Sequence, residues 1–238
     1  MKFLILNAGS SSQKSCLYEL AGDRLPERAP EPLWEAFIDW TVLQDQGQLR
    51  VKTSGQKQVK TLETNDRRLG IAKMLETLIT GENAVLESLE EIDLVGHRVV
   101  HGGTDYAEAT LITPAVEQAI ADLIPLAPAH NPAHLEGIEA ISALLGEVPQ
   151  IAVFDTAFHR TIPPAAAEYA IPQTWTNLGI RRYGFHGTSH KYCAQKTAGI
   201  LGKPLADLKL ITCHIGNGAS LTAIKNGVSI DTTMGFTP

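Results

Sequence analysis

Short apolar runs that stop at polar or glycine-containing turns recur along most of the chain. Apolar or alternating runs of four to eight residues, bounded by turn residues, favour strands. Two of the turns carry hairpin signals, Asp45-Gln46-Gly47 and Asn226-Gly227, and an Asn-Gly turn is the strongest such signal at short range. The predicted strands are residues 2–7, 14–20, 33–43, 48–53, 92–100, 150–154, 208–213, 220–225 and 228–231.

Longer segments space their apolar residues at helical intervals, and they predict helices over residues 66–80, 113–124, 131–145 and 189–201. Pro114 lies in the first turn of the second of these helices, where proline is well tolerated. Residues 21–32 and 160–180 contain several prolines, and they predict a surface loop and an irregular segment. Because strands, hairpins and helices are interleaved, the expected fold class is α/β, with mixed sheets flanked by helices.

The length of 238 residues predicts one or two domains, and a boundary near residue 150 divides the chain into residues 1–150 and 151–238. The sequence stops at Pro238 directly after a predicted strand, so we expect the second domain to be incomplete. A net charge of −6 without a basic segment argues against nucleic acid as a partner. No apolar run approaches the roughly 18 residues of a membrane span, which argues against a membrane partner. Three cysteines without a CxxC pair predict reduced thiols and a cytoplasmic location.

A hydroxyl-rich turn follows the first predicted strand, in the segment Asn7-Ala8-Gly9-Ser10-Ser11-Ser12-Gln13-Lys14. Gly9 allows the backbone to approach phosphate oxygens closely, and Lys14 adds a compact positive charge. Asn7, Ser10 and Ser12 supply oxygens and donors that bind phosphate or help to hold a metal ion. This segment therefore predicts a site for a polyphosphate.

A second strand-then-loop segment has the sequence His214-Ile215-Gly216-Asn217-Gly218-Ala219-Ser220. It follows the predicted strand at residues 208–213 and repeats the plan of the N-terminal segment. Two such segments in one chain suggest two halves that close on a nucleotide.

Four further residues are candidates for chemistry, and the first three have plainer alternatives. Arg98 ends an apolar strand and can bind a carboxylate or phosphate with two hydrogen bonds, or form an ordinary ion pair. Asp155 ends the strand at 150–154, where ligands bind in α/β folds, or it caps the next turn. His186 lies between glycines and can donate to a phosphoryl group or simply order its loop. His130 precedes a predicted helix and can lie beside an anion.

Other classes of enzyme receive little support from the sequence. Three histidine pairs have the HxxxH spacing, but none has the HExxH glutamate and no cysteine pair completes a zinc ligand set. The chain also lacks a Gly-x-Ser-x-Gly elbow, a GxxxxGK[ST] loop and a GxGxxG fingerprint. A zinc or serine hydrolase is therefore a weak hypothesis.

Taken together, ordered motifs along the whole chain resemble those of the acetate kinase family, within the superfamily of acetate and sugar kinases, heat-shock chaperones and actin. The motifs that carry the resemblance are residues 7–12, 96–103, 130–132, 154–159, 183–190, 214–220 and 231–238. The resemblance implies two ribonuclease-H-like domains, as in actin-like ATPases, an N-terminal domain for acyl substrate and phosphate, and a C-terminal domain for nucleotide. It also implies a homodimer.

The activity implied by the resemblance is reversible transfer of the ATP γ-phosphoryl group to acetate, with Mg²⁺, or Mn²⁺ in its place, as cofactor. By motif, Asn7 would hold the metal and Arg98 the acetate, with catalytic roles for Asp155 and His186 and a supporting role for His130. The residues expected near ATP and its phosphates are Ser10, Ser12, Lys14, His214, Ile215, Gly216, Asn217 and Gly218. The residues expected around the acetate methyl group are Val100, Phe185 and Pro238.

One departure from the family pattern is Ala129, where the family usually has leucine before the histidine. A smaller side chain predicts a wider methyl pocket and better tolerance of propionate. Two alternatives to an acetate kinase therefore remain open, a kinase of propionate or another short-chain acyl group and an inactive nucleotide-binding fragment. The family's later site residues would lie beyond Pro238, so we expect little activity from these 238 residues alone.

Overall fold

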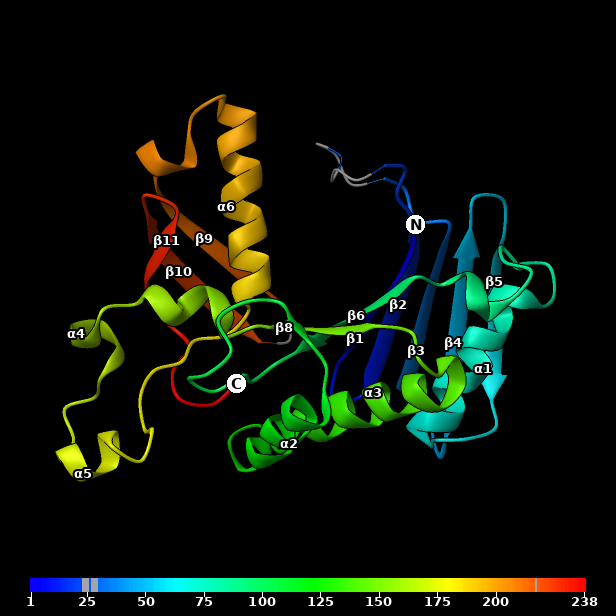
Figure 1. The fold of residues 1–238 in the computed structure, drawn as a ribbon, viewed down its shortest axis with the longest axis horizontal. Coiled ribbons are helices and arrows are strands. Elements are labelled where there is room, and N and C mark those ends of the chain that lie inside the picture. The colour runs from blue at the N-terminus through cyan, green and yellow to red at the C-terminus, as the bar shows by residue number, and fades with distance from the viewer. Residues whose placement is uncertain (23–25, 27–29, 217) are drawn as a thin grey trace. The chain divides into compact units, whose positions relative to one another are not determined.

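A computed structural model describes residues 1–22, 26, 30–216 and 218–238 of the chain (Figure 1). The chain forms two compact units, each assembled from segments that are separate in sequence. Unit 1 comprises Met1–Arg98, Leu111–Ala121 and Ala129–Ala152. Unit 2 comprises Val99–Thr110, Asp122–Pro128 and Val153–Pro238.

Unit 1 contains most of a mixed sheet of eight strands in the order β5-β4-β3-β2-β1-β6-β8-β7. Strand β1 is antiparallel to β2 and parallel to β6, so both pairing modes meet on this strand. The strands are β1 (Lys2–Ala8), β2 (Ser12–Glu19), β3 (Trp34–Leu43), β4 (Gln46–Thr53), β5 (Lys57–Leu62), β6 (Leu94–Val99), β7 (Thr110–Leu111) and β8 (Gln150–Phe154). The predicted α/β class with mixed sheets is confirmed.

One face of this sheet is apolar because its strands alternate in burial. In β1, for example, Leu4 and Leu6 are buried whereas Ile5 and Asn7 are exposed. Two helices, α1 (Arg67–Ile79) and α3 (Asn131–Leu145), pack against each other and against β3 and β1 respectively (Figure 1). The shared core includes Trp34, Ile38, Leu49, Ile71, Met74, Leu75, Leu78 and Ile141.

Helices α1 and α2 (Pro114–Asp122) agree closely with the prediction. Helix α2 starts at the proline expected in its first turn. Asp66 caps α1, and its side chain accepts a hydrogen bond from the Leu69 amide at 3.1 Å. Strand β6 is shorter than predicted, because a 3₁₀ turn at Leu89–Glu91 ends in Ile92.

The predicted turn between β3 and β4, Asp45-Gln46-Gly47, begins one residue too late and ends two residues too late. Strand β4 already begins at Gln46, so the connection is Gln44-Asp45, with Asp45 at a φ of 57°. Gly47 lies within the strand, where a Cβ atom would meet the ring of Trp40 at 3.2 Å. The glycine therefore serves the packing of Trp40, and the turn depends on the tolerance of aspartate for a positive φ.

The sequence patterns missed strands β5 and β7. Strand β5 lies at the edge of the sheet, and only its last residue, Leu62, is buried. A charged edge strand of this kind lacks the alternation that marks a strand facing the core. Strand β7 has two residues, too few to form a pattern.

Unit 2 contains a three-stranded antiparallel sheet, with β10 (Ala219–Lys225) between β9 (Lys209–Ile215) and β11 (Val228–Thr232). Helix α6 (Gly187–Leu201) packs on β9 (Figure 1). The Asn226-Gly227 turn is confirmed, and both residues have positive φ values, 54° and 84°. This is the geometry of a two-residue hairpin between right-twisted strands.

Three predictions in unit 2 need correction. The segment at 160–180 is not wholly irregular, because it forms the single-turn helices α4 (Pro164–Ala167) and α5 (Gln173–Thr176). Helix α6 begins two residues earlier than predicted. Strand β9 continues two residues further, because Ile215 pairs with Ala219 of β10.

The predicted loop at 21–32 lies partly outside the described residues, which omit 23–25 and 27–29. Among the helices in the described part of the chain, none is long and apolar enough to cross a membrane.

The core of unit 1 predicts a contrast between two leucines of α1. Leu78 is completely buried and Leu69 is 57% exposed. We expect Leu78→Ala to lower the free energy of unfolding by about 2–5 kcal/mol, because it leaves a cavity between α1 and the sheet. Leu69→Ala, the matched control, should change it by less than about 0.5 kcal/mol. Urea denaturation of both variants measures the difference, and equal midpoints would contradict this description of the core.

Candidate functional site

A row of polar side chains crosses unit 1 on the sheet face opposite the helices. Asn7 of β1 pairs in register with Arg98 of β6 on one side and with Lys14 of β2 on the other. Directly opposite residues on neighbouring strands point to the same face. Arg98 Nη1 donates to Asn7 Oδ1 at 3.3 Å. The structure therefore brings together these three predicted residues, which lie up to 91 positions apart in sequence.

The hydroxyl-rich segment forms the tight turn from Gly9 to Ser12 that joins β1 to β2. The Gly9 amide donates to the Ser12 carbonyl at 2.8 Å, so it closes the turn. The Gly9 amide is thus engaged within the turn, and the expectation that this glycine lets the backbone approach phosphate oxygens stays a prediction. The need for glycine is steric, since a Cβ atom here would lie 3.0 Å from Ser12 Oγ. Ser10 is exposed and Ser12 is half-buried.

His130 takes the position predicted for it, immediately before the first residue of α3. Its side chain is half-buried and makes no capping bond to the helix. The next residue, Asn131, is fully buried and donates to the Ile120 carbonyl at 3.0 Å, which fixes the start of the helix. His134 lies one turn further along, and burial holds its pKa well below the ordinary value for histidine.

Asp155 follows the last residue of β8 in unit 2 and is almost fully buried. Its Oδ1 accepts a hydrogen bond from the Thr188 hydroxyl at 3.1 Å, and its carbonyl accepts one from the Gly187 amide at 2.9 Å. A Cβ atom on residue 187 would overlap that carbonyl oxygen, so only glycine permits this approach. The carboxylate is thereby held against the first turn of α6. The N-cap position of the next 3₁₀ turn is occupied by Thr156, whose side chain makes no capping hydrogen bond.

His186 adopts a left-handed backbone conformation, with φ 61° and ψ 21°, immediately before α6. Histidine tolerates this region at a cost of about 1 kcal/mol or more, and strain of this kind concentrates at functional sites. Its ring stacks on that of His214, with centroids 4.0 Å apart. Its Nδ1 lies 2.9 Å from Ser220 Oγ, so the ring is held from two sides.

A buried network behind His186 was missed by the sequence patterns. Ser220 Oγ also lies 2.7 Å from His190 Nε2, and His190 Nδ1 lies 2.7 Å from Thr212 Oγ1. Ser220 and His190 thus form a layer of polar contacts behind His186. The signal available in the sequence was the HxxxH spacing of His186 and His190. A zinc hypothesis interprets these histidines as metal ligands, whereas in the structure both lie at hydrogen-bond distance from Ser220 Oγ.

The predicted nucleotide segment lies at the end of β9. His214 and Ile215 belong to the strand, and His214 Nδ1 lies 3.0 Å from Ser189 Oγ. Beyond the strand, the Gly216 amide donates to the Gly218 carbonyl at 3.0 Å, and both glycines are exposed. Asn217, the remaining residue of this prediction, lies outside the described residues.

The residues expected around the methyl group are only partly assembled. Val100 and Phe185 lie in one apolar cluster of unit 2 with Tyr183, Met234 and Phe236. Val100 and Phe185 are at most 2% exposed, so neighbouring side chains cover both. Pro238 is half-buried and is not a member of this cluster.

Each unit contains an oxygen donor of the kind that divalent metal ions prefer. Within the part of the chain that the structure describes, no group of three or more His, Cys, Asp or Glu side chains is arranged to hold a metal ion. Mg²⁺ requires fewer protein ligands, because it is usually held by one or two carboxylates together with substrate phosphates and water. The buried Asp155 carboxylate and the amide oxygen of Asn7 are hard oxygen donors of the appropriate kind. Asn7 Oδ1 already accepts a hydrogen bond from Arg98, which leaves one lone pair for another partner.

A serine-rich turn after the first strand and a histidine at a helix N-terminus are features that suit a protein that binds phosphate groups. The acetokinase family profile matches residues 2–238. The chain therefore belongs to the acetokinase family.

Relatives and solved structures agree with this assignment. The chain is 87% identical to an acetate kinase of Synechocystis sp., covering 100% of this chain and 58% of that protein. The crystal structure of Porphyromonas gingivalis acetate kinase matches with a TM-score of 0.86 and 41% identity, over 100% of this chain and 58% of that one. A propionate kinase from Francisella tularensis matches with a TM-score of 0.87 and 41% identity over the same shares. The chain thus spans about 58% of the length of these relatives.

Buried histidines predict that the fold loses stability in mild acid. Burial lowers the pKa of His97, His101 and His190 from 6.5 to about 4. Between pH 6.5 and 4 the unfolded chain binds protons that the folded chain does not, so the free energy of unfolding falls as the pH falls. At most about 3 kcal/mol is lost per fully buried histidine, at 1.36 kcal/mol per pKa unit.

Urea denaturation of the unmodified chain and of His97→Gln at several pH values measures this effect. We expect a shallower loss of stability in the variant between pH 6.5 and 4. The two proteins should have parallel pH profiles between pH 7 and 8, where His97 does not titrate. Identical slopes in the acid range would show that His97 is not held neutral by the fold.

Proposed function

We propose that the protein carrying this chain is an acetate kinase, which transfers the γ-phosphoryl group of ATP to acetate and forms acetyl phosphate and ADP reversibly. Family membership and the acetate kinases among its relatives support this proposal. The single observation that carries it is the row of Arg98, Asn7 and Lys14, which lines up groups suited to a carboxylate and a phosphate across three adjacent strands.

The reaction needs little proton transfer, because acetate is an anion at neutral pH. One carboxylate oxygen attacks the γ-phosphorus in line, the bond from that phosphorus to the bridging oxygen breaks, and ADP leaves with the electron pair. Two negatively charged reactants must approach each other, so catalysis depends on positioning and on positive charge or hydrogen-bond donors. In this scheme Arg98 binds the acetate carboxylate, and Lys14, Ser10 and Ser12 bind phosphate oxygens.

His186 would stabilise the phosphoryl group during transfer, with His130 in support. Ser220 Oγ lies at hydrogen-bond distance from His186 Nδ1, so a hydroxyl that donates to this nitrogen leaves the hydrogen on Nε2. We assign this tautomer because it leaves Nε2 as a donor to phosphoryl oxygen. Ser220 can then accept a hydrogen bond from His190 Nε2, while His190 Nδ1 accepts one from the Thr212 hydroxyl. With this assignment each of these three contacts has one donor and one acceptor.

We assign Asn7 as an oxygen donor to Mg²⁺, with Mn²⁺ as a substitute, and we assign Asp155 to organising metal or water rather than to taking a proton. Bound Mg²⁺ neutralises phosphate charge and polarises the phosphorus centre. Asp155 is suited to this role, because its carboxylate is fixed by Thr188 and is not needed as a base.

The remaining assignments concern the two domains, the residues that contact ATP and the residues around the methyl group. Residues 1–150 would form the domain for acyl substrate and phosphate, and residues 151–238 the start of the nucleotide domain. The exposed Gly216 and Gly218 beside His214 and Ile215 would contact ATP, as would Asn217 between them. Val100, Phe185 and Pro238 would surround the methyl group, which requires movement of the side chains that cover the first two.

We further propose a cytoplasmic homodimer. The cytoplasmic assignment is supported by three unpaired cysteines, Cys16, Cys193 and Cys213, as expected in a reducing compartment.

Hydroxamate formation from acetate, ATP and Mg²⁺ tests the proposed function. The assay compares the 238-residue chain with the protein at its full natural length. We expect acetyl phosphate from the full-length protein and little from the 238-residue chain. Activity in neither would favour the alternative of a nucleotide-binding module, and calorimetry with ATP would then be the deciding measurement.

Replacing Arg98 should weaken the binding of acetate, because two hydrogen bonds are lost together with the charge. Loss of a bidentate, charge-assisted contact removes about 1.5–3 kcal/mol. We therefore expect Arg98→Ala to raise the KM for acetate roughly 10- to 100-fold and to lower kcat. Arg50→Ala is the matched control, because Arg50 is an exposed arginine on the same sheet face of β4 and should leave both constants within about twofold. Unchanged kinetics in Arg98→Ala would remove Arg98 from the site.

A second candidate function is propionate kinase, because a propionate kinase matches the fold as well as an acetate kinase does. The small exposed Ala129, next to His130, also favours a larger acyl group. We expect Ala129→Leu to lower the ratio of kcat/KM for propionate to kcat/KM for acetate. The change should correspond to no more than about 1–3 kcal/mol, the discrimination that one methylene provides. Equal ratios in the unmodified and substituted full-length proteins would show that Ala129 does not line the acyl pocket.

A further inference from the structure

Arg67 departs from the usual chemistry of a helix start. It is the first residue of α1, directly after the cap residue Asp66. The helix dipole makes this end positive, so acidic side chains are favoured there and basic ones are not. The first turn of α1 nevertheless contains no acidic residue and begins with two arginines. Such a departure from a local rule suggests a role outside the helix.

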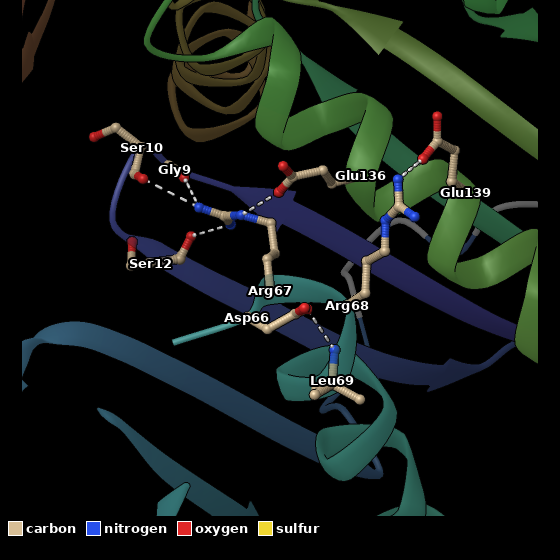
Figure 2. A network of polar contacts seen from close by, with 9 residues as sticks. All are labelled: Gly9, Ser10, Ser12, Asp66, Arg67, Arg68, Leu69, Glu136 and Glu139. Carbon is tan, nitrogen blue, oxygen red and sulfur yellow. Dashed lines mark hydrogen bonds and ion pairs between the residues drawn. The ribbon is translucent and has the colours of Figure 1, made fainter. Parts of the chain in front are cut away.

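The guanidinium of Arg67 binds the backbone of the turn between β1 and β2 (Figure 2). Its Nη2 donates to the carbonyl oxygens of Gly9 and Ser10, each at 3.1 Å. Its Nη1 lies 3.4 Å from the carbonyl oxygen of Ser12 and donates to it. One side chain therefore holds three of the four carbonyl groups in this turn.

The fourth carbonyl group is held by the residue on which Arg67 stacks. The Trp40 amide donates to the Ser11 carbonyl at 3.1 Å. The Arg67 guanidinium lies over the Trp40 ring, 4.6 Å from its centroid, in a cation–π contact. Trp40 itself is fitted closely, since a Cβ atom on Gly70 would lie 3.0 Å from its ring.

Glu136 of α3 fixes the remaining edge of the guanidinium, with its Oε2 3.5 Å from Arg67 Nε (Figure 2). The Arg67 side chain is only 10% exposed, and burial lowers its pKa from the ordinary value for arginine. A largely buried guanidinium is stable only when its donors are matched, and its planar fork can match several carbonyl groups at once. These contacts span α1, α3, β3 and the β1–β2 turn.

The neighbouring pair provides a contrast. Arg68 forms an ion pair with Glu139, also on α3, but its side chain is 60% exposed (Figure 2). No contact of Arg68 with the turn is recorded among the described residues. Surface pairs of this kind contribute little to stability. Two consecutive arginines thus pair with the same helix, and only the first reaches the turn.

We infer that Arg67 is a positioning residue, which holds the Gly9–Ser12 turn through its carbonyl groups so that Ser10, Ser12 and Lys14 face phosphate. This inference rests on the proposed function, in which those three side chains bind phosphate oxygens. A hydroxyl-rich turn would otherwise sample several conformations, and misplacement of about 1 Å can lower a rate roughly 100-fold. Arg67 does this from behind the turn, without contact with substrate.

The test compares four full-length proteins, the unmodified form, Arg67→Lys, Glu136→Gln and Arg68→Ala. Lysine keeps the charge but cannot bind three carbonyl groups in the same plane. We expect Arg67→Lys to lower kcat at least tenfold and to raise the KM for ATP at least fivefold, with the KM for acetate within twofold. Glu136→Gln should act in the same direction by two- to fivefold. Arg68→Ala should match the unmodified protein within twofold.

Hydrogen–deuterium exchange followed by mass spectrometry adds a measurement that does not depend on activity. In Arg67→Lys we expect faster exchange confined to the peptide covering residues 7–14, with the core of α1 unchanged. Arg68→Ala should show no change in either peptide. Faster exchange throughout unit 1, or a loosened turn with unaltered kinetics, would overturn the positioning role.

Failure of this inference is distinguishable from failure of the proposed function. An unmodified protein that forms no acetyl phosphate would refute the function, and the kinetic role of Arg67 with it. An active unmodified protein whose Arg67→Lys variant behaves like Arg68→Ala would refute the inference alone.

Discussion

Strand β1 determines the geometry of unit 1, because it is parallel to β6 on one side and antiparallel to β2 on the other. Its register brings Asn7 beside Arg98 and beside Lys14 at once. A shift of one residue would turn Leu4 and Leu6 out of the core and Asn7 into it, so burial of these leucines also fixes the polar row. The core and the candidate site thus depend on one constraint.

Unit 2 shows a different way of fixing functional groups, in which close backbone approach replaces sheet register. Gly187 allows α6 to start against the Asp155 carbonyl, and this places the His186 backbone in the left-handed region. Stacking on His214 and the hydroxyl of Ser220 then hold the His186 ring. Such over-determined contacts offset the strain and keep a histidine at the helix N-terminus.

Both units support the proposed reactive groups with a second layer of polar contacts. In unit 1 the layer is Arg67 with Glu136 and Trp40, and in unit 2 it is Ser220 with His190. A kinase that joins two anions requires fixed donors more than it requires an acid or a base. Preorganised donors of this kind are consistent with the membership of the chain in the acetokinase family.

The sequence by itself determined most elements, because alternation, helical spacing, Pro114 and Asn226-Gly227 are local signals. It also indicated the family, through a resemblance carried by ordered motifs along the chain. It also named Arg98, Asn7, Lys14, Asp155 and His186 as candidates from their places beside strands and glycines. It did not reveal β5, whose edge position leaves it with few buried side chains, or the position of the Gln44-Asp45 turn, where Gly47 serves tertiary packing. Only the tertiary structure decided two sets of hydrogen bonds, those of Ser220 with two histidines and those of Arg67 with the Gly9–Ser12 turn. The physical reason is that these contacts join residues 30 to 58 positions apart, so no local pattern of hydrophobic and polar residues records them.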